Sequence, residues 1–226
     1  MAYQRTPYVE SKRAEARARL VQAALALMAR GGWRQVQVSD VALEAGLSTG
    51  TVYLHFGSKT ELLTEVYRSQ ASAELQVVTQ IADQAAPAAR RIALAVQAFA
   101  KRAMSNRRLA YAMVLEPTEI AVEEERLRFH ACFIEQFRRI LDAGVASGEF
   151  DVADTHIAAA CIFGGITESL MSPLGIASRS PERGSGRNDA AVLVDRIVAF
   201  CFDGLGRPAS TGRRRAGARS ATRKSA

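Results

Sequence analysis

Residues 38–63 read VSDVALEAGLSTGTVYLHFGSKTELL, and this stretch decides the fold. Gly46 interrupts it, and glycine tolerates the left-handed backbone conformation that ends a helix. Ser48 follows two residues later, and serine is a preferred residue at a helix start because its hydroxyl accepts a hydrogen bond from a free backbone N–H. The pattern predicts two short helices joined by a tight turn, the first over about 38–45 and the second over about 49–55.

The second of these helices starts with residues suited to DNA. Its N-terminus reads Ser48-Thr49-Gly50-Thr51, and such small side chains let a helix approach base edges in the major groove. Free backbone N–H groups at a helix start also bind phosphate oxygens. Side chains that can donate hydrogen bonds to phosphates follow at Tyr53, His55 and Lys59. The two helices therefore predict a helix-turn-helix, in which the first helix braces the second against DNA.

A wider set of residues fits this motif at fixed spacing: Gly32-Trp33, then Val41-Ala42-x-x-Ala45-Gly46-Leu47-Ser48-x-Gly50-x-x-Tyr53-x-His55-Phe56-x-x-Lys59-x-x-Leu62-Leu63. Through them, residues 13–73 resemble the TetR family of bacterial transcriptional regulators. The resemblance implies a three-helix N-terminal DNA-binding domain, followed by a helical domain that binds a ligand and forms a dimer. It also implies that bases are touched by Thr49, Gly50 and Thr51, and phosphates by Tyr53, His55 and Lys59.

The start of the bracing helix departs from the family pattern. The family commonly has Ser or Thr where this chain has Gln37, and glutamine is a poor helix cap, so Ser39 is an alternative start. Leu54 is an apolar residue at an exposed recognition position, where a thymine methyl group is a suitable contact. The complete set of expected DNA-binding residues is Gln37, Val38, Ser39, Ser48, Thr49, Gly50, Thr51, Tyr53, Leu54, His55 and Lys59.

The rest of the chain also shows the apolar spacing of helices. Residues 1–10 are expected to be unstructured, and a helix is predicted over about 11–29. Ser58 and Glu61 have the spacing of a capping box, which opens a long helix. The further predicted helices cover about 59–83, 88–104, 106–115, 119–147, 152–171 and 188–205. No stretch alternates long enough to be a strand, so we expect an all-α fold of about nine helices.

Charge is distributed unevenly along the chain. The formal net charge is +7, from 30 basic and 23 acidic residues. Residues 207–226 hold seven of the basic residues and no acidic one, so the remainder is neutral with 23 of each kind. DNA binding must therefore be inferred from the motif. The predicted organisation is a DNA-binding domain over 11–73 with its helix-turn-helix at about 37–56, a ligand-binding and dimerisation domain over 74–206, and a disordered basic tail over 207–226.

The resemblance also implies that the last two long helices pair with those of a second copy. The segments 152–171 and 188–205 are rich in small and apolar residues, which permit close helix approach, although both could instead pack within one subunit. We expect a homodimer. Its two recognition helices would meet half-sites of a near-palindromic operator about one DNA turn, roughly 34–36 Å, apart.

The C-terminal half contains aromatic and methionine side chains with a few polar groups, as many ligand pockets do. An ordinary helical core has the same composition. The candidate ligand-binding residues are Phe99, Met104, Tyr111, Met113, His130, Phe133, Phe137, Phe163, Glu168 and Met171. They indicate an apolar or aromatic small effector. The resemblance implies that such an effector releases a repressor from its operator. A transcriptional activator and a ligand-independent, architectural DNA-binding protein are the alternatives.

Other classes of protein find no support in the sequence. Cys132, Cys161 and Cys201 lack the spacing of a zinc site or a disulfide framework, so we expect free thiols, and neither a metal nor a cofactor is predicted. No arrangement of a nucleophile and a base points to an enzyme. No apolar run approaches the ~18 residues that cross a bilayer, and the polar N-terminus has no signal segment. We therefore expect a cytoplasmic protein.

Overall fold

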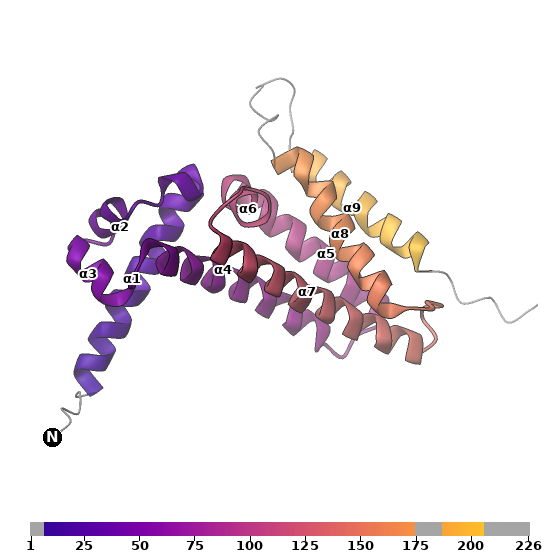
Figure 1. Cartoon of the computed structure of the whole chain (residues 1–226). Helices are drawn as coiled ribbons and strands as arrows, with labels where there is room; N and C mark the ends of the chain where they lie inside the picture. Colours follow the sequence, from indigo (N-terminus) through magenta and orange to yellow (C-terminus); the bar gives the residue numbers. More distant parts are fainter. Residues whose placement is uncertain (1–6, 175–186, 206–226) are drawn as a thin grey trace, which may run out of the picture.

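The computed structural model describes residues 7–174 and 187–205, and nearly all of them are helical (Figure 1). The elements in chain order are α1 Pro7–Gly31, the 3-10 helix η1 Trp33–Gln35, α2 Val38–Glu44, α3 Thr49–His55, α4 Lys59–Ala82, α5 Ala88–Ser105, α6 Arg107–Val114, α7 Ile120–Ala146, α8 Thr155–Leu174 and α9 Arg187–Gly204. No strand occurs among the described residues, and the predicted all-α fold is confirmed. The predicted basic tail lies outside them.

Two helix starts, those of α1 and α8, differ from the predictions by three or four residues, and the alternative start of α2 is wrong. α1 begins at Pro7 rather than near residue 11, because proline fits the first position of a helix, where no backbone N–H is needed. α2 begins at Val38 with Gln37 in the cap position, so the alternative start at Ser39 is wrong. α8 begins at Thr155 rather than 152, because the carboxylate of Asp154 accepts hydrogen bonds from the first free N–H groups of that helix.

The N-terminal helices close around a small apolar core. Its fully buried side chains come from α1, η1 and its flanks, α2, α3 and the start of α4, and include Leu20, Met28, Val36, Val41, Phe56 and Leu62. Trp33 is also buried, as its place in the connection predicts, whereas Leu47 in the turn is only half-buried. The core holds α3 on the outside of the molecule, where Figure 1 shows it beside α2.

Helix α4 connects this core to a larger helical body. Its first half packs on α1, and along its length it packs on α7, which in turn packs on α8. Helices α5 and α6 complete the body, and α9 lies against α5 and α8 at the far end from α3 (Figure 1). The body is therefore a bundle in which five helices, α4 to α8, can surround a shared interior.

Candidate nucleic-acid interface and ligand cavity

The start of α3 is organised by its own polar side chains. The Ser48 hydroxyl accepts a hydrogen bond from the backbone N–H of Thr51 at 3.1 Å, and the two hydroxyls lie 2.9 Å apart. Thr49 and Gly50 are exposed and Thr51 is half-buried. A Cβ at Gly50 would meet only the Ser48 hydroxyl, so no packing obstructs this end of the helix. The predicted base-reading residues thus form a small, open helix start.

The remainder of α3 has an exposed side and a buried side, with His55 half-buried between them. Tyr53 and Leu54 are 53% and 70% exposed, while Val52 and Phe56 are buried. Leu43 at the end of α2 is 82% exposed and was not predicted as a surface residue of this region. An exposed leucine such as Leu43 has no distinctive sequence signal, because a core residue of an amphipathic helix looks the same.

Arginines of α1 brace the motif from behind. Arg30 forms a two-bond ion pair with Glu44 of α2, with one N–O distance of 2.7 Å. Arg17 lies 4.4 Å from the centre of the Phe56 ring and is paired with Glu65 of α4 at 3.1 Å. These contacts tie α1 to α2, to the residue that follows α3, and to α4. The orientation of the recognition helix is consequently set by the whole N-terminal unit.

Gln37 has a role other than that of a helix cap. Its side-chain amide donates to the carbonyl of Arg34 at 2.9 Å, and its Oε1 accepts from Nζ of Lys59 at 3.1 Å. Lys59 is the first residue of α4, so this chain of bonds links the starts of two helices. Ser58 caps α4 as predicted, accepting from Glu61 N, but the Glu61 carboxylate returns to the N–H of Gly57 rather than to that of Ser58.

His55, at the end of α3, lies in a basic neighbourhood. A shallow surface hollow brings it together with Arg13 and Arg17 of α1, although Glu10 and Glu61 also line it. Partial burial, and then the charges of Arg13 and Arg17, lower the pKa of His55 below its ordinary 6.5. His55 is therefore mainly neutral near pH 7 and can donate one hydrogen bond from its N–H.

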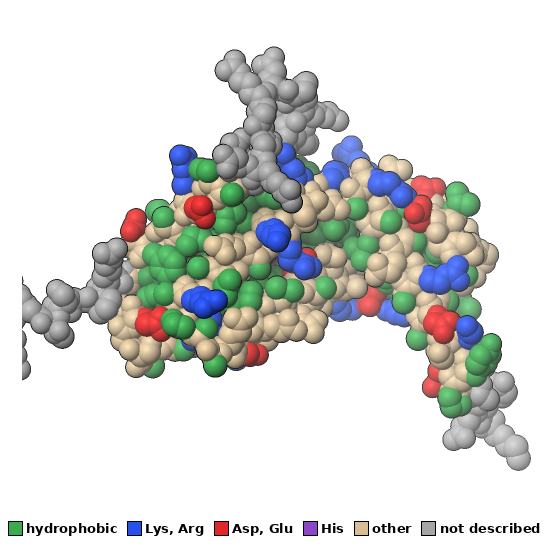
Figure 2. Space-filling view, turned by 180° about the vertical axis from the view of Figure 1, so that it is seen from behind, with side chains coloured by type: hydrophobic (Ala, Val, Ile, Leu, Met, Phe, Trp, Pro, Cys, Tyr) green, Lys and Arg blue, Asp and Glu red, His purple; other side chains and the backbone are tan. Residues whose placement is uncertain are grey.

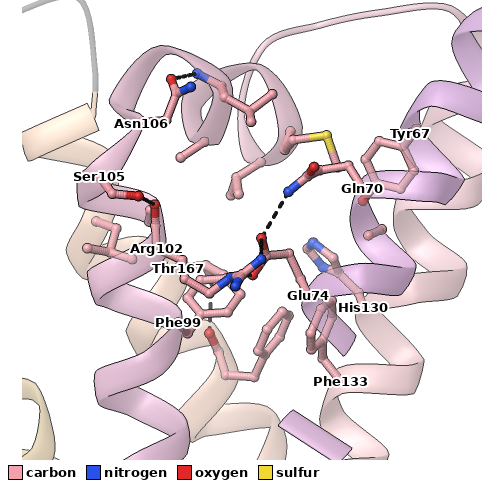
Figure 3. A pocket seen from close by; sticks show the side chains of 18 residues that line it. Tyr67, Gln70, Glu74, Phe99, Arg102, Ser105, Asn106, His130, Phe133 and Thr167 are labelled. Atoms are coloured by element: carbon pink, nitrogen blue, oxygen red, sulfur yellow. Dashed lines mark hydrogen bonds and ion pairs between the residues drawn. The ribbon is translucent and has the colours of Figure 1, made fainter. Parts of the chain in front are cut away.

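Helices α4 to α8 enclose a cavity of about 320 Å³ (Figure 3). Five of the predicted ligand-binding residues line it: Phe99, Met113, His130, Phe133 and Phe163. The others do not form its wall among the described residues. Met104 and Tyr111 are half-buried away from it, Phe137 is fully buried behind Phe163, and Glu168 is exposed to solvent. The side chain of Met171 lies outside the described residues.

The cavity has an aromatic end. The rings of Phe133 and Phe163 stack with centroids 5.3 Å apart, and Phe99 meets both edge-on. His130 meets Phe163 edge-on at 5.2 Å, and burial together with the charge of Arg126 lowers the pKa of His130. A neutral imidazole in an aromatic wall keeps this end of the cavity suited to an apolar group.

The cavity also has polar groups that the sequence analysis missed. Arg102 of α5 donates two hydrogen bonds to the carboxylate of Glu74 of α4, the Nη2 bond being 2.8 Å. Gln70, one turn earlier on α4, donates to the same carboxylate at 2.9 Å. Gln70 and Glu74 are four residues apart, so the sequence indicates that they share one side of α4. It does not reveal whether that side faces the cavity or the solvent.

Helix α6 lies between the cavity and the N-terminal helices. Leu109 and Met113 line the cavity, whereas Arg108 donates to the carbonyl of Gly31 at 2.7 Å. The indole N–H of Trp33 donates to the carbonyl of Ala112 at 2.8 Å. One short helix thus contacts both the interior of the body and the end of α1.

This junction explains the Gly32-Trp33 pair. Gly32 has φ 75°, in the left-handed region, and a Cβ there would overlap the Arg108 guanidinium and the Glu116 carboxylate. Arg108 and Glu116 are themselves an ion pair at 2.9 Å, so the glycine lets the half-buried Arg108 side chain of α6 lie against the end of α1.

Helices α8 and α9 present a hydrophobic face to solvent. Ile157 and Phe200 are 60% and 75% exposed, and Val192 is 42% exposed. A Cβ added at Gly164 or Gly165 would meet nothing within 4 Å, so these glycines are not required by packing within the chain. Figure 2 shows hydrophobic side chains gathered over the larger, C-terminal part of the molecule.

Two kinds of feature are absent from the described residues. No cluster of three or more His, Cys, Asp or Glu side chains is arranged to hold a metal ion in residues 7–174 and 187–205. Within the same ranges, none of the helices combines the length and apolar character that crossing a membrane requires.

The chain is similar to known proteins both in sequence and in fold. Residues 20–66 match the family model "Bacterial regulatory proteins, tetR family". The chain is 25% identical over 156 residues to the fatty acid metabolism regulator protein of Bacillus subtilis (strain 168), covering 68% of this chain and 80% of that protein. Two solved structures share the fold, each with a TM-score of 0.69.

One of these structures is the transcriptional regulator FadR of Bacillus subtilis in complex with stearoyl-CoA, at 22% identity and covering 84% of this chain and 99% of that one. The other is the fatty acid degradation regulator FadR of Bacillus halodurans, at 21% identity and covering 90% and 99%. The helix-turn-helix lies within the segment that the family model matches, and the helical body behind it agrees with these two folds. The helix-turn-helix unit is therefore of the tetR type found in bacterial regulatory proteins, and the chain resembles the transcriptional regulators that carry this unit.

Proposed function

We propose that the protein is a homodimeric repressor that binds a near-palindromic operator and leaves it when a small amphipathic effector enters the cavity between α4 and α8. The observation that carries this proposal is the position of α6, which lines the cavity with Leu109 and Met113. On its other side α6 contacts the end of α1 through Arg108, and Trp33 of η1 through the carbonyl of Ala112. A ligand that moves α6 would also move the end of α1 and, through its arginines, the recognition helix.

The DNA-binding part of the proposal assigns base contacts to the exposed start of α3. This start consists of Thr49, Gly50 and Thr51, and the exposed Leu54 can contact a thymine methyl group. Phosphate contacts are assigned to Tyr53, to the start of α2, to the His55 N–H and to Lys59. Lys59 already donates to Gln37, so the same ammonium group can position α2 and bind a phosphate with its remaining hydrogens. This assignment makes residues 11–73 the DNA-binding domain.

The effector part of the proposal rests on the shape and chemistry of the cavity. An aromatic end and a polar group at the other side suit a ligand with an apolar tail and a polar head. The curated relative is a fatty acid metabolism regulator, and the structure of FadR from Bacillus subtilis contains stearoyl-CoA. We therefore propose an acyl compound. A volume of about 320 Å³ is at the lower end for ligand sites, which favours an acyl chain shorter than stearoyl.

The dimer part of the proposal rests on the exposed face of α8 and α9. Large apolar side chains such as Ile157 and Phe200 are costly to leave in water, and contiguous exposed apolar patches mark interaction sites. The open glycines of α8 would let a partner helix approach closely. An isologous pairing of these helices makes residues 74–206 a combined ligand-binding and dimerisation domain.

The test measures operator binding directly. DNA from upstream of the protein's own gene would be labelled, and binding followed by fluorescence anisotropy over a salt series, with wild type, Thr51→Ala and Arg90→Ala. Arg90 is exposed at the start of α5, far along the chain from the motif, and serves as the charge-loss control. Sequence-specific binding lost in Thr51→Ala alone is expected. Binding that is indifferent to DNA sequence would overturn the regulator mechanism.

The effector is tested in the same assay. Decanoyl-CoA added to the preformed complex is expected to weaken operator binding by about 5- to 150-fold, the usual range of allosteric coupling. Tighter operator binding with the acyl compound would instead support an activator or a co-repressed regulator. A ligand-independent DNA-binding protein is disfavoured by the cavity itself, since such a protein has no need of an unfilled interior.

A further inference from the structure

A polar bridge crosses the effector cavity. Figure 3 shows the Arg102 side chain reaching from α5 to Glu74 on α4, with Gln70 directed at the same carboxylate from the other side. The rings of Phe99 and Phe133 lie on one side of this bridge, and the α6 end of the cavity with Asn106 lies on the other. A ligand that fills the cavity must therefore meet the bridge.

The members of the bridge are only partly shielded from water. The side chain of Arg102 is 45% exposed and that of Glu74 is 21% exposed, which places the guanidinium toward the mouth of the cavity. The guanidinium uses Nε and Nη2 on Glu74, and its Nη1 forms no hydrogen bond within the described ranges. Arg102 consequently has donors left for a second acceptor without any rearrangement of the helices.

The carboxylate can also release the guanidinium. Glu74 keeps the hydrogen bond from Gln70 if Arg102 turns away, and its partial exposure lets water supply the rest. A ligand anion that replaces Glu74 would leave the guanidinium paired, so the exchange avoids an isolated buried charge. Arginine suits this exchange because its planar fork binds carboxylate and phosphate oxygens with two parallel bonds.

We propose that Arg102 binds the anionic head group of an amphipathic effector by exchanging Glu74 for it, while the apolar tail lies against Phe99 and Phe133. This inference rests on the proposed function only in taking the cavity as the effector site, and it adds a requirement for negative charge. The anion has two sources in acyl compounds. It is the carboxylate of a free fatty acid or a phosphate of an acyl-CoA.

The test compares three probes of equal chain length by isothermal titration calorimetry on the full chain. Decanoate carries a carboxylate, decanoyl-CoA carries phosphates, and decanol is neutral. Wild type is expected to bind at least one of the two anionic probes at least tenfold more tightly than decanol, because hydrogen bonds to charged groups are the strong ones. Arg102→Gln should remove that preference, whereas Lys101→Gln should keep it. Lys101 is the neighbouring exposed cation and does not line the cavity.

A second variant separates a binding role from a structural one. Glu74→Gln removes the competitor for the guanidinium, so it should tighten binding of the anionic probe, opposite in sign to Arg102→Gln. Arg102→Lys should give an intermediate affinity, since it keeps the charge and loses the fork. If the bridge merely held α4 to α5, both removals would weaken binding together. Thermal unfolding of each variant would show that it remains folded.

The outcomes distinguish the two sources of the anion. They also distinguish a failure of the Arg102 inference from a failure of the proposed acyl effector. Loss of decanoate affinity in Arg102→Gln assigns a carboxylate, and loss of decanoyl-CoA affinity assigns a phosphate. Equal binding of decanol and the anions, or identical behaviour of Arg102→Gln and Lys101→Gln, overturns the inference while leaving an apolar effector in place. Binding of none of the three probes overturns the inference together with the proposed acyl effector.

Discussion

Replacing Trp33 by phenylalanine tests whether the junction between α1 and α6 transmits the effector signal. The substitution keeps an aromatic ring in the buried site but removes the indole N–H that donates to the carbonyl of Ala112 at 2.8 Å. The exposed surface of α3, to which the proposal assigns the DNA contacts, is left unchanged. Operator affinity without effector should therefore stay close to that of wild type, while the response to effector falls.

The magnitude follows from the partners that remain. A net intramolecular hydrogen bond is worth about 0.5–1.5 kcal/mol, and leaving its acceptor unsatisfied costs more. The carbonyl of Ala112 keeps a second donor, Nη2 of Arg126 at 3.3 Å, so that extra penalty is avoided. The smaller ring leaves a small void. We expect a loss of about 1–2 kcal/mol in the free energy of unfolding, which lowers Tm by roughly 2–8 °C for a chain of this length.

The coupling should fall by a similar amount. If the Trp33 bond exists in only one of the two conformers, its loss removes about 1 kcal/mol of coupling, or about a fivefold smaller effect of effector on the operator Kd. Anisotropy titrations with and without saturating effector measure this ratio. Glu149→Ala is the matched control, because it removes the carboxylate that caps α5 at Ala88 and Ala89 and should cost similar stability far from the junction.

One pattern of results would refute a signalling role for the Trp33 contact. If Trp33→Phe and Glu149→Ala lowered Tm alike and both kept the wild-type ratio of operator Kd values, the Trp33 contact would be structural only. The signal would then have to pass through α4, which also spans the two parts of the molecule. A reduced ratio in Glu149→Ala alone would exclude the α6 route as well.

Three further perturbations have defined outcomes. Ser48→Ala removes the cap of α3 and should cost about 1 kcal/mol of stability and weaken operator binding, read by thermal unfolding and anisotropy. Phe200→Glu puts a charge on the exposed apolar face of α9 and should convert the dimer to monomer in sedimentation, with the helical circular dichroism unchanged. Burial and Arg126 lower the pKa of His130, so the unfolded chain takes up a proton first as pH falls below 6.5, and stability should decline there. His130→Gln should flatten that decline below pH 6.5 without abolishing it, because the pKa of His55 is lowered too.

The motif could be predicted from the sequence because its determinants are local. Ser48 caps its own helix three residues on, and Gly46, with φ 61°, permits the turn between α2 and α3. Gln37 shows the limit of such reasoning. Its cap position gave no reason to expect a bond to Lys59, 22 residues away, because that bond depends on how α4 docks on α2.

The cavity could be predicted only in part, and for a physical reason. Phe133 and Phe137 lie one turn apart on the same side of α7, yet Phe133 lines the cavity and Phe137 packs behind Phe163. Apolar periodicity gives the inward side of a helix but not the depth at which a space remains. That depth depends on the packing of five helices, which no single periodicity encodes.

The contact between Arg102 and Glu74 could not be predicted from the sequence at all. Glu74 and Arg102 are 28 residues apart on different helices, and either alone is indistinguishable from a solvated surface charge. Their meeting depends on the rotation of α4 relative to α5, the same relative position that an entering ligand would disturb. At its other end, α4 begins directly after the recognition helix α3. A ligand that takes Arg102 from Glu74 would thus release α4 from α5 at the cavity while α6 responds at the junction. The two routes to α3 would then be perturbed by one binding event.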